Sequence, residues 1–234
     1  LQIKNFAENK DGTKFELFWQ GEKICSIDWQ MPGEYNARNL AMSFLSSVLT
    51  QAICEGKEIL RTNPFSGFKL PDYSSCKGVK RRQEILVDQD EFTVISDFAH
   101  HPTAIAGTLE SLRARWANRK IIACFEPRSN TAVTNIFQDR FADSLSIADE
   151  VLLGAVHRGD KIPVAQRIDT QAMIDRIKNS GREGCSFSKN SDLGDYLKSK
   201  NNLNQAVLTV FFSNGSFDGE IEKFVQYVTP KDLS

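Results

Sequence analysis

The residues best suited to chemistry follow the β-branched residues Val94 and Ile95, and they begin with Asp97. His100 and His101 come next, directly before Pro102, and a helical pattern starts at this proline. Because proline is favoured in the first turn of a helix, the segment predicts a strand, a loop and a helix. Ligands of open α/β sheets bind at the carboxyl ends of strands, where such loops gather. These side chains could hold a ribose hydroxyl, a phosphate or a metal ion.

Each of these residues also has a plain structural interpretation. Asp97 could equally be a helix N-cap or a turn residue. His100 and His101 could be partly solvated loop residues, and a metal site would need a third ligand. The basic run 77–82 could bind phosphate or form a solvated turn. The run 213–216 could cradle an anion at a helix start or only make a tight turn.

The elements that must position these residues alternate between strand and helix after residue 90. Short apolar runs predict strands, and apolar residues at three-and-four spacing predict helices. The predicted strands are 92–97, 120–125, 150–153, 185–187 and 206–212, and the predicted helices are 102–117, 135–148, 170–179, 191–199 and 217–228. Five such units with short connections predict a doubly wound, mostly parallel, Rossmann-like α/β sheet with right-handed crossovers.

Polar clusters follow four of the predicted strands. They are His100–His101, Glu126–Asn130, His157–Lys161 and Ser213–Ser216. Because the strands are predicted to be parallel, all four clusters should lie at one edge of the sheet. This coincidence indicates a functional site more strongly than any single cluster does.

The first part of the chain has a different pattern. Residues 14–20 and 23–29 predict a hairpin, and apolar residues at helical spacing from Leu40 to Ile53 predict a helix that ends near Gly56. Proline, glycine and serine are frequent between residues 62 and 80, which indicates a linker. We therefore predict two domains, residues 1–76 and 77–234.

Composition places the chain among ordinary globular proteins. Of 234 residues, 41% are hydrophobic and 25% charged, and the net charge of -1 gives no general attraction for nucleic acid. No apolar run reaches the ~18 residues of a membrane span, and no secretion signal is present. The cysteines are scattered and form no C-x-x-C pair, which indicates reduced thiols and a cytoplasmic location. They are Cys25, Cys54, Cys76, Cys124 and Cys185.

Taken together, five stretches resemble the Mur ligases, and they occur in the family's order. They are 33–41, 78–84, 97–103, 125–131 and 213–215. The resemblance implies the end of a central ATPase domain, residues 1–76, followed by a Mur ligase carboxy-terminal domain. A Mur ligase also needs a G-x-x-G-K-[ST] phosphate loop, and this sequence has none. We therefore expect the chain to be part of a longer enzyme and to be inactive alone.

The resemblance implies an ATP-dependent amide ligase of peptidoglycan recycling. In the branch it resembles most, UDP-N-acetylmuramate is joined to L-Ala-γ-D-Glu-meso-diaminopimelate through an acyl phosphate. The cofactors would be ATP and Mg²⁺, with the Mg²⁺ held mainly outside this chain. Such an enzyme is expected to be a cytoplasmic monomer without nucleic-acid or membrane partners.

The resemblance also assigns roles to individual residues. Arg82 and His100 would face the ATP phosphates and act in catalysis, and Asp97 would hold the ribose. Asn36 and Asn39 would face the adenine. The peptide substrate would contact Arg128, Ser129, Asn130, Ser213 and Asn214. No residue of this chain is expected to bind metal.

This sequence departs from the family pattern at several positions. Tyr35 replaces a common histidine, Val133 replaces a basic residue, and Ser216 and Asp218 replace glycines. An insertion at Lys69–Cys76 lengthens the expected linker.

Two other classes of function remain open from the sequence. The chain could be a non-catalytic doubly wound module that binds an anion or a nucleotide. It could also be a metal-dependent hydrolase built on Asp97, His100, His101 and His157, which would hold stoichiometric transition metal.

Overall fold

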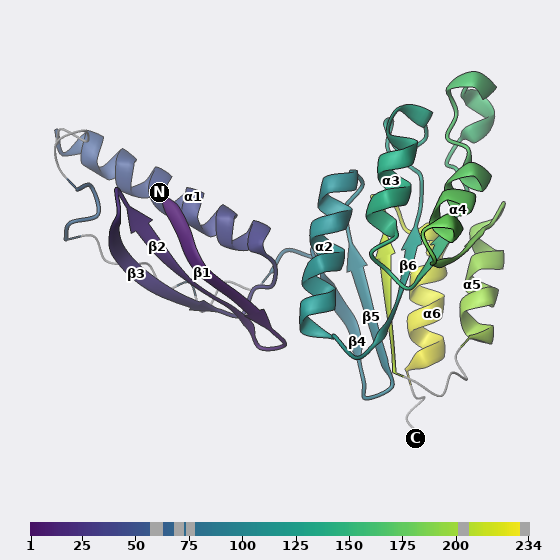
Figure 1. Ribbon diagram of the computed structural model, residues 1–234, viewed down its shortest axis with the longest axis horizontal. Coiled ribbons are helices and arrows are strands. Elements are labelled where there is room, and N and C mark those ends of the chain that lie inside the picture. The colour runs from purple at the N-terminus through teal and green to yellow at the C-terminus, as the bar shows by residue number, and fades with distance from the viewer. Residues whose placement is uncertain (57–62, 68–72, 74–77, 201–205, 230–234) are drawn as a thin grey trace. The chain divides into compact units, whose positions relative to one another are not determined.

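The computed structural model describes residues 1–56, 63–67, 73, 78–200 and 206–229. The chain forms two compact units, Leu1–Gly78 and Val79–Ser234, each with its own core (Figure 1). Apart from Tyr73, the insertion noted at Lys69–Cys76 lies outside the described residues. The same is true of Lys77, the first residue of the basic run.

The first unit is an antiparallel sheet with a helix packed against it. The strands β1 (Gln2–Asn9), β2 (Gly12–Trp19) and β3 (Glu22–Trp29) lie in that order, and α1 spans Glu34–Cys54. Phe15 and Leu17 of β2 pack with Phe44 and Val48 of α1 in the core. The predicted hairpin and helix are confirmed, but the helix already begins at Glu34. Ile53, predicted on its buried face, is 65% exposed.

The second unit contains a six-stranded sheet in the order β4-β5-β9-β6-β7-β8. The strands are β4 (Glu84–Asp88), β5 (Phe92–Asp97), β6 (Lys120–Phe125), β7 (Glu150–Leu153), β8 (Glu183–Ser186) and β9 (Val207–Phe212). All neighbours pair in parallel except β4, which is antiparallel to β5. The predicted fold class, a doubly wound and mostly parallel α/β sheet, is confirmed.

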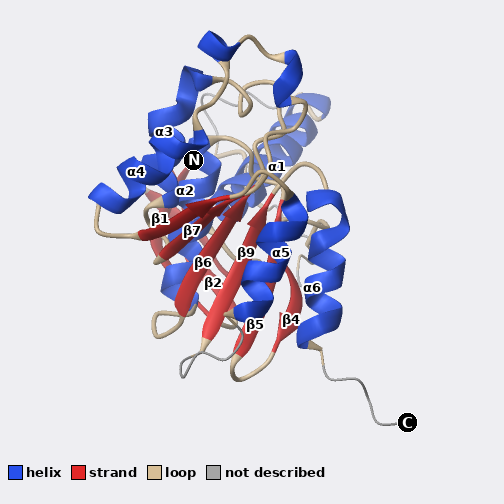
Figure 2. Cartoon of the chain, turned by 90° about the vertical axis from the view of Figure 1, so that its right-hand side faces the viewer, coloured by secondary structure: helices blue, strands red, loops and turns tan. Residues whose placement is uncertain are grey.

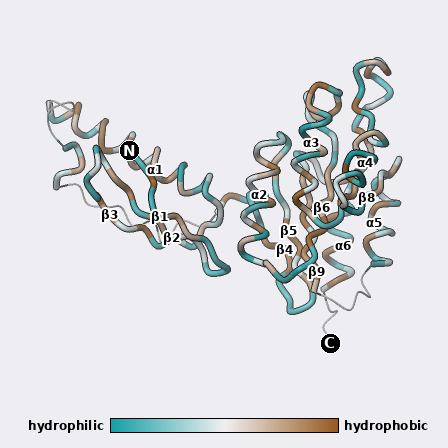
Figure 3. Tube along the Cα trace, viewed as in Figure 1, coloured by the Kyte–Doolittle hydropathy of each residue, from teal (hydrophilic) through white to brown (hydrophobic). Residues whose placement is uncertain are grey.

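Helices cover both faces of this sheet (Figure 2). They are α2 (Pro102–Arg115), α3 (Gln138–Leu145), α4 (Thr170–Asn179), α5 (Asn190–Ser199) and α6 (Glu220–Val228). Side chains of α2, α3 and α4 share one core cluster, and those of α5 and α6 share the other. Figure 3 shows how hydropathy is distributed along the chain, and β9 between the two cores is buried at every position. No helix in the described parts of the chain is long and apolar enough to cross a membrane.

Strand register brings the carboxyl ends of the parallel strands level with one another. Phe212 of β9 pairs with Asp97 of β5 and with Phe125 of β6, and Phe125 pairs with Leu153 of β7. The loops that follow β5, β6, β7 and β9 therefore leave the sheet at one edge, as the parallel topology requires. The polar clusters predicted to share an edge do share it.

Candidate functional site

Four segments meet at this edge of the sheet, and we call them together the strand-end cluster. They are Arg81–Gln83 before β4, Asp97–His101 after β5, Glu126–Asn130 after β6 and Ser213–Ser216 after β9. Main-chain bonds join neighbouring segments: the Glu126 amide donates to Phe212 O at 3.0 Å and the Ser213 amide donates to Asp97 O at 3.1 Å. The segments thus form one connected surface.

Asp97 is a buried carboxylate at the end of β5. It accepts hydrogen bonds from the amides of Gln83 at 2.9 Å and Ala99 at 2.7 Å, and from the Thr108 hydroxyl at 3.5 Å. Burial raises the pKa of Asp97, although these amide bonds and the charge of Arg82 act in the opposite direction. Asp97, at the end of β5, therefore stabilises the turn that contains Arg82. A ribose contact would be additional to these bonds and stays a prediction.

His100 and His101 stabilise the loop between β5 and α2. His100 Nδ1 lies 3.0 Å from Phe98 O, and its ring meets the Phe98 ring edge-on at 5.3 Å. His101 is the N-cap of α2, and its Nδ1 accepts the Thr103 amide at 3.3 Å. The two rings thus have different local roles, although they are neighbours in sequence.

His157 lies on the loop after β7, and its main-chain amide donates to Pro127 O at 2.9 Å. In the described residues, no group of three or more His, Cys, Asp or Glu side chains is arranged to hold a metal ion. Asp97, His100, His101 and His157 therefore do not form the ligand set that a metal-dependent hydrolase would need.

Arg81 and Arg82 both place their guanidinium groups over the Phe98 ring, at 5.2 and 5.4 Å from its centroid. Arg81 also donates to the carbonyl oxygens of Ser213, at 2.5 Å, and of Gly215. Its backbone has a φ of 62°, in the left-handed region. Arg82 is exposed, so its guanidinium is accessible to an anion. The sequence analysis identified Arg82 but missed Arg81, because nothing within a run of consecutive basic residues indicates which of them is bonded to a distant segment.

Glu126 was not predicted as a site residue, yet it lies at the centre of the cluster. It is 2% exposed and accepts the Ser213 hydroxyl, the Phe217 amide at 3.3 Å and Asn190 Nδ2 at 3.3 Å. A fourth donor, Arg128 Nη1, is 3.4 Å away. The apolar strand before it and Pro127 after it were the available signals that this carboxylate is held at the sheet.

The residues predicted to contact the peptide follow Glu126. The Arg128 side chain is 30% exposed and lies on Gly215, where a Cβ would be 2.5 Å from Arg128 Cδ. Ser129 Oγ accepts the Ala132 amide at 3.2 Å, and Asn130 is exposed. Arg128 and Asn130 are therefore accessible, whereas the Ser129 hydroxyl also shapes its own loop.

Ser213 and Asn214 form the turn after β9. Ser213 is buried, and its Oγ accepts the Gly215 amide at 2.7 Å while it donates to Glu126. Asn214 Oδ1 is buried and has no hydrogen-bond partner within the described parts of the chain. An amide oxygen in this state favours a ligand that brings a donor.

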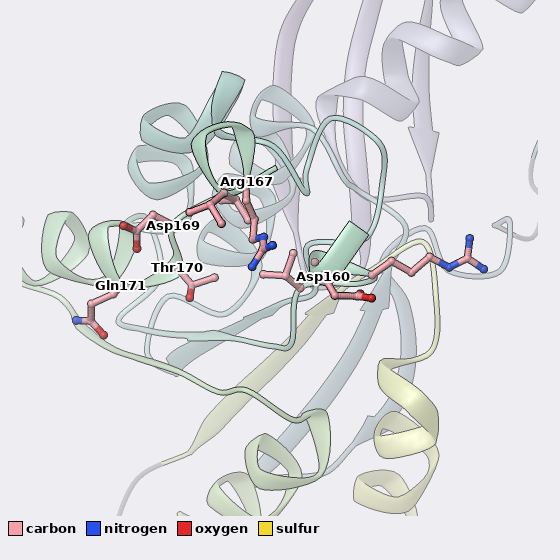
Figure 4. Close-up of a pocket in the computed structure, with 10 residues that line it drawn as sticks. Asp160, Arg167, Asp169, Thr170 and Gln171 are labelled. Carbon is pink, nitrogen blue, oxygen red and sulfur yellow. The ribbon is translucent and has the colours of Figure 1, made fainter. Parts of the chain in front are cut away.

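The loop after β7 adds a pocket of 520 Å³ next to this cluster. Its lining includes Arg158, Asp160, Arg167 and Thr170, and Figure 4 shows Arg167 extending between Thr170 and Asp160. Arg167 donates to Ile162 O at 2.8 Å, while its Nε is buried without a hydrogen-bond partner among the described residues. The pocket thus presents both positively and negatively charged side chains to a polar ligand.

Main-chain bonds connect this pocket to the loop that carries Arg128. The Ile168 amide donates to Val133 O at 3.0 Å, and Thr134 forms a β-bridge with Arg167. Val133, where the family often has a basic residue, is buried and packs at this junction. The pocket and the loop that carries Arg128 therefore belong to one continuous structure.

Asn36 and Asn39 belong to the first unit. Asn36 is buried at the start of α1 and donates to Pro32 O at 2.6 Å, whereas Asn39 is exposed. The Tyr35 ring lies against Gly33, which has a φ of 88° and no room for a Cβ. The adenine contacts of both asparagines stay predictions.

Comparison with known proteins places these motifs in a family context. The Mur ligase, glutamate ligase domain family matches residues 81–210. A UDP-N-acetylmuramate–L-alanine ligase of Clostridium acetobutylicum is 30% identical over 90% of this chain and 43% of its own length. The Escherichia coli UDP-N-acetylmuramate–L-alanyl-γ-D-glutamyl-meso-2,6-diaminoheptandioate ligase is 36% identical over 61% of this chain and 29% of its own length.

The fold is shared with a solved structure. The crystal structure of UDP-N-acetylmuramate–alanine ligase from Thermotoga maritima matches 96% of this chain and 44% of its own, with a TM-score of 0.68 and 21% identity. This chain therefore spans less than half the length of these three relatives.

Proposed function

Because this chain belongs to the Mur ligase family, we propose that it supplies the carboxy-terminal domain of an ATP-dependent amide ligase. The reaction proposed is the joining of UDP-N-acetylmuramate to L-Ala-γ-D-Glu-meso-diaminopimelate in peptidoglycan recycling. The observation that carries the proposal is the strand-end cluster, in which Arg81, the neighbour of the exposed Arg82, and the half-buried Arg128 both contact one short loop, residues 213–215. One arginine suits a nucleotide phosphate and the other a peptide carboxylate.

The residues on the nucleotide side fit an anionic cofactor. ATP, with Mg²⁺, would supply the phosphoryl group that turns a carboxylate into an acylating agent. Arg82 is accessible and lies over Phe98, so it can compensate negative charge without first breaking a hydrogen bond to the described residues. Asp97 holds the turn of Arg82 through the Gln83 amide. His100 contacts Phe98, the residue over whose ring Arg82 lies.

The residues on the peptide side fit a substrate with several carboxylates and an amine. Arg128 can make two parallel hydrogen bonds with a carboxylate. Asn214 Oδ1, buried and without a partner in the described residues, can accept a bond from a substrate N–H. The pocket of 520 Å³ beside them has far more room than a single alanine needs, and Arg158 and Arg167 suit a further carboxylate. The size of the pocket therefore favours the peptide over free alanine.

The test is a ligation assay on the gene product that contains this chain, with UDP-N-acetylmuramate and ATP. The tripeptide and L-alanine are compared as acceptors, and the 234-residue chain alone serves as the inactive control. We expect the tripeptide to be the better acceptor. Arg82→Ala should cut turnover about tenfold to a hundredfold, which corresponds to roughly 1.5–3 kcal/mol. Preference for alanine would favour the L-alanine ligase activity, and no ligation would favour a binding module.

A further inference from the structure

Glu126 is a buried carboxylate that the roles above leave unused. We propose that Glu126 is a positioning residue that holds Arg128 and the 213–215 loop in the arrangement that meets the peptide. What Arg128 binds rests on the proposed function, whereas the way Glu126 holds Arg128 rests on the contacts alone. Glu126 itself is covered, with 2% of its surface exposed, so it acts through its neighbours.

The four donors around Glu126 divide evenly between its two oxygens. Oε2 accepts the Ser213 hydroxyl and the Phe217 amide, and Oε1 accepts Asn190 Nδ2 and faces Arg128 Nη1. A carboxylate has about four acceptor positions, so this one is fully used. Because the donors come from the loop after β9, the start of α5 and the loop after β6, one side chain fixes three segments.

Arg128 is held at two points and free elsewhere. Glu126 takes one N–H at 3.4 Å, and Gly215 receives the aliphatic end of the side chain, with no space for a Cβ. An arginine has five N–H donors in a rigid plane, so fixing one edge orients the remaining donors. Those donors are the ones a substrate carboxylate would engage. A fixed orientation lowers the entropy lost when the carboxylate binds.

The loop on the other side of Glu126 is held in the same way. Ser213 Oγ donates to Glu126 and accepts the Gly215 amide, while Arg81 binds the carbonyl oxygens of Ser213 and Gly215. The seat of Arg128 is therefore built from atoms that Glu126 and Arg81 fix together. Because Arg81 precedes Arg82 in the chain, these bonds also connect the 213–215 loop to the turn that carries Arg82.

Two conservative substitutions separate reach from charge. Glu126→Gln keeps the length and can turn its amide oxygen toward Arg128 and Asn190. Its NH₂ then faces Ser213, whose hydroxyl can rotate to accept; the Phe217 amide loses its partner, and the Ser213 O–H loses the acceptor that Glu126 gave it. Glu126→Asp keeps the charge but is one methylene shorter, so it cannot reach Arg128 across a contact that is already 3.4 Å. If the length of the side chain at position 126 holds Arg128, the Arg128 side chain should be ordered in Glu126→Gln and disordered in Glu126→Asp.

The first measurement is NMR relaxation of the arginine Nε–H groups in the 234-residue chain. Arg128 should be ordered in wild type and Glu126→Gln, and mobile in Glu126→Asp. Arg176, which pairs with Asp143 at 2.6 and 2.9 Å, is the internal reference and should not change. Asp143→Ala is the matched control, which should mobilise Arg176 and leave Arg128 ordered. Equal Arg128 order in the Asp variant and wild type would overturn the proposal.

The second measurement uses the gene product that contains this chain. Glu126→Asp should raise the peptide KM about tenfold and leave the ATP KM within about twofold, whereas Glu126→Gln should restore the peptide KM. Equal losses for both substrates would show a merely structural role and overturn the proposal. If the wild-type enzyme ligates no peptide but Arg128 still loosens in Glu126→Asp, the proposed function fails and the positioning role stands.

Discussion

Arg81 and Arg82 are neighbours in one basic run, but the structure predicts opposite consequences when each is removed. Arg81 bonds the carbonyl oxygens of Ser213 and Gly215 from a left-handed backbone conformation, whereas Arg82 is exposed. Arg81→Ala should therefore destabilise the second unit. Arg82→Ala should leave its stability nearly unchanged and act on turnover instead.

The magnitude follows from the contacts of Arg81. Hydrogen bonds that involve a charged group contribute about 1.5–3 kcal/mol, and the half-buried position of Arg81 favours the lower part of that range for the pair. For a domain of this size, 1 kcal/mol shifts Tm by about 2–4 °C, so Arg81→Ala should lower Tm by roughly 3–8 °C. Arg82→Ala should change the free energy of unfolding by less than about 0.5 kcal/mol.

A third variant separates the guanidinium from the backbone. Arg81→Gly also loses both hydrogen bonds, but glycine adopts a φ of 62° without steric cost. It should therefore be about 1 kcal/mol more stable than Arg81→Ala.

Because the chain has two units, the assay must report on the second unit alone. Hydrogen exchange of the buried amides of β9, read by mass spectrometry, meets this need. A loss of protection in Arg82→Ala as large as in Arg81→Ala would refute the distinction between the two arginines.

Three further predictions concern other parts of the second unit. Burial alone would raise the pKa of Glu150, but hydrogen bonds, first from Lys120, lower it. The stabilisation that the charged Glu150 contributes to the fold is therefore present above the usual pKa of a glutamate. It is lost as the pH falls through the lowered pKa of the folded state. Glu150→Gln should cost about 3 kcal/mol near pH 7 in urea unfolding read from the amide protection of β9, and the difference from wild type should vanish in acid. Asp218, with a φ of 54°, should tolerate glycine better than alanine by about 1 kcal/mol in the same assay. Gly215→Ala should displace Arg128 and raise the peptide KM with less than about 1 kcal/mol lost in stability, and an unchanged KM would show that Arg128 needs no fixed seat.

The sequence predicted the buried strands well because their signal is local. The predicted bounds of β5, β6 and β7 agree with the structure, and each of these strands is an apolar run between polar turns. The edge strand β4 was missed because its apolar run spans only three residues, Ile85–Val87, between Glu84 and Asp88. Edge strands carry such charged residues because these discourage pairing with other chains. Their pairing depends on a neighbour rather than on their own composition.

Helix ends were harder to predict where turns of a different kind precede the helix. Residues 135–148 were predicted as one helix, but the structure has a 3-10 turn at Asn135–Phe137 before α3, which ends at Leu145. Likewise, α6 begins at Glu220, after a turn in which Phe217 and Asp218 adopt positive φ angles. Neither residue type requires that conformation, so the hydrophobic spacing extended both helices too far.

The candidate site shows where local sequence stops being informative. The parallel topology placed the right loops at one edge, because strand ends are set by apolar runs that can be read one at a time. Within those loops, however, burial is decided by partners far along the chain: Glu126 bonds Ser213 across 87 positions and Arg81 bonds Ser213 across 132. A charged residue in a polar loop is usually solvated, so the apolar strand and the proline beside Glu126 were weak signals of its burial, and Arg81 had no local signal that distinguished it from Arg82. The residues proposed to meet ligands and the residues that hold them are thus distinguished only after the sheet has formed, and Arg82 and Arg128 are positioned by neighbours far along the chain.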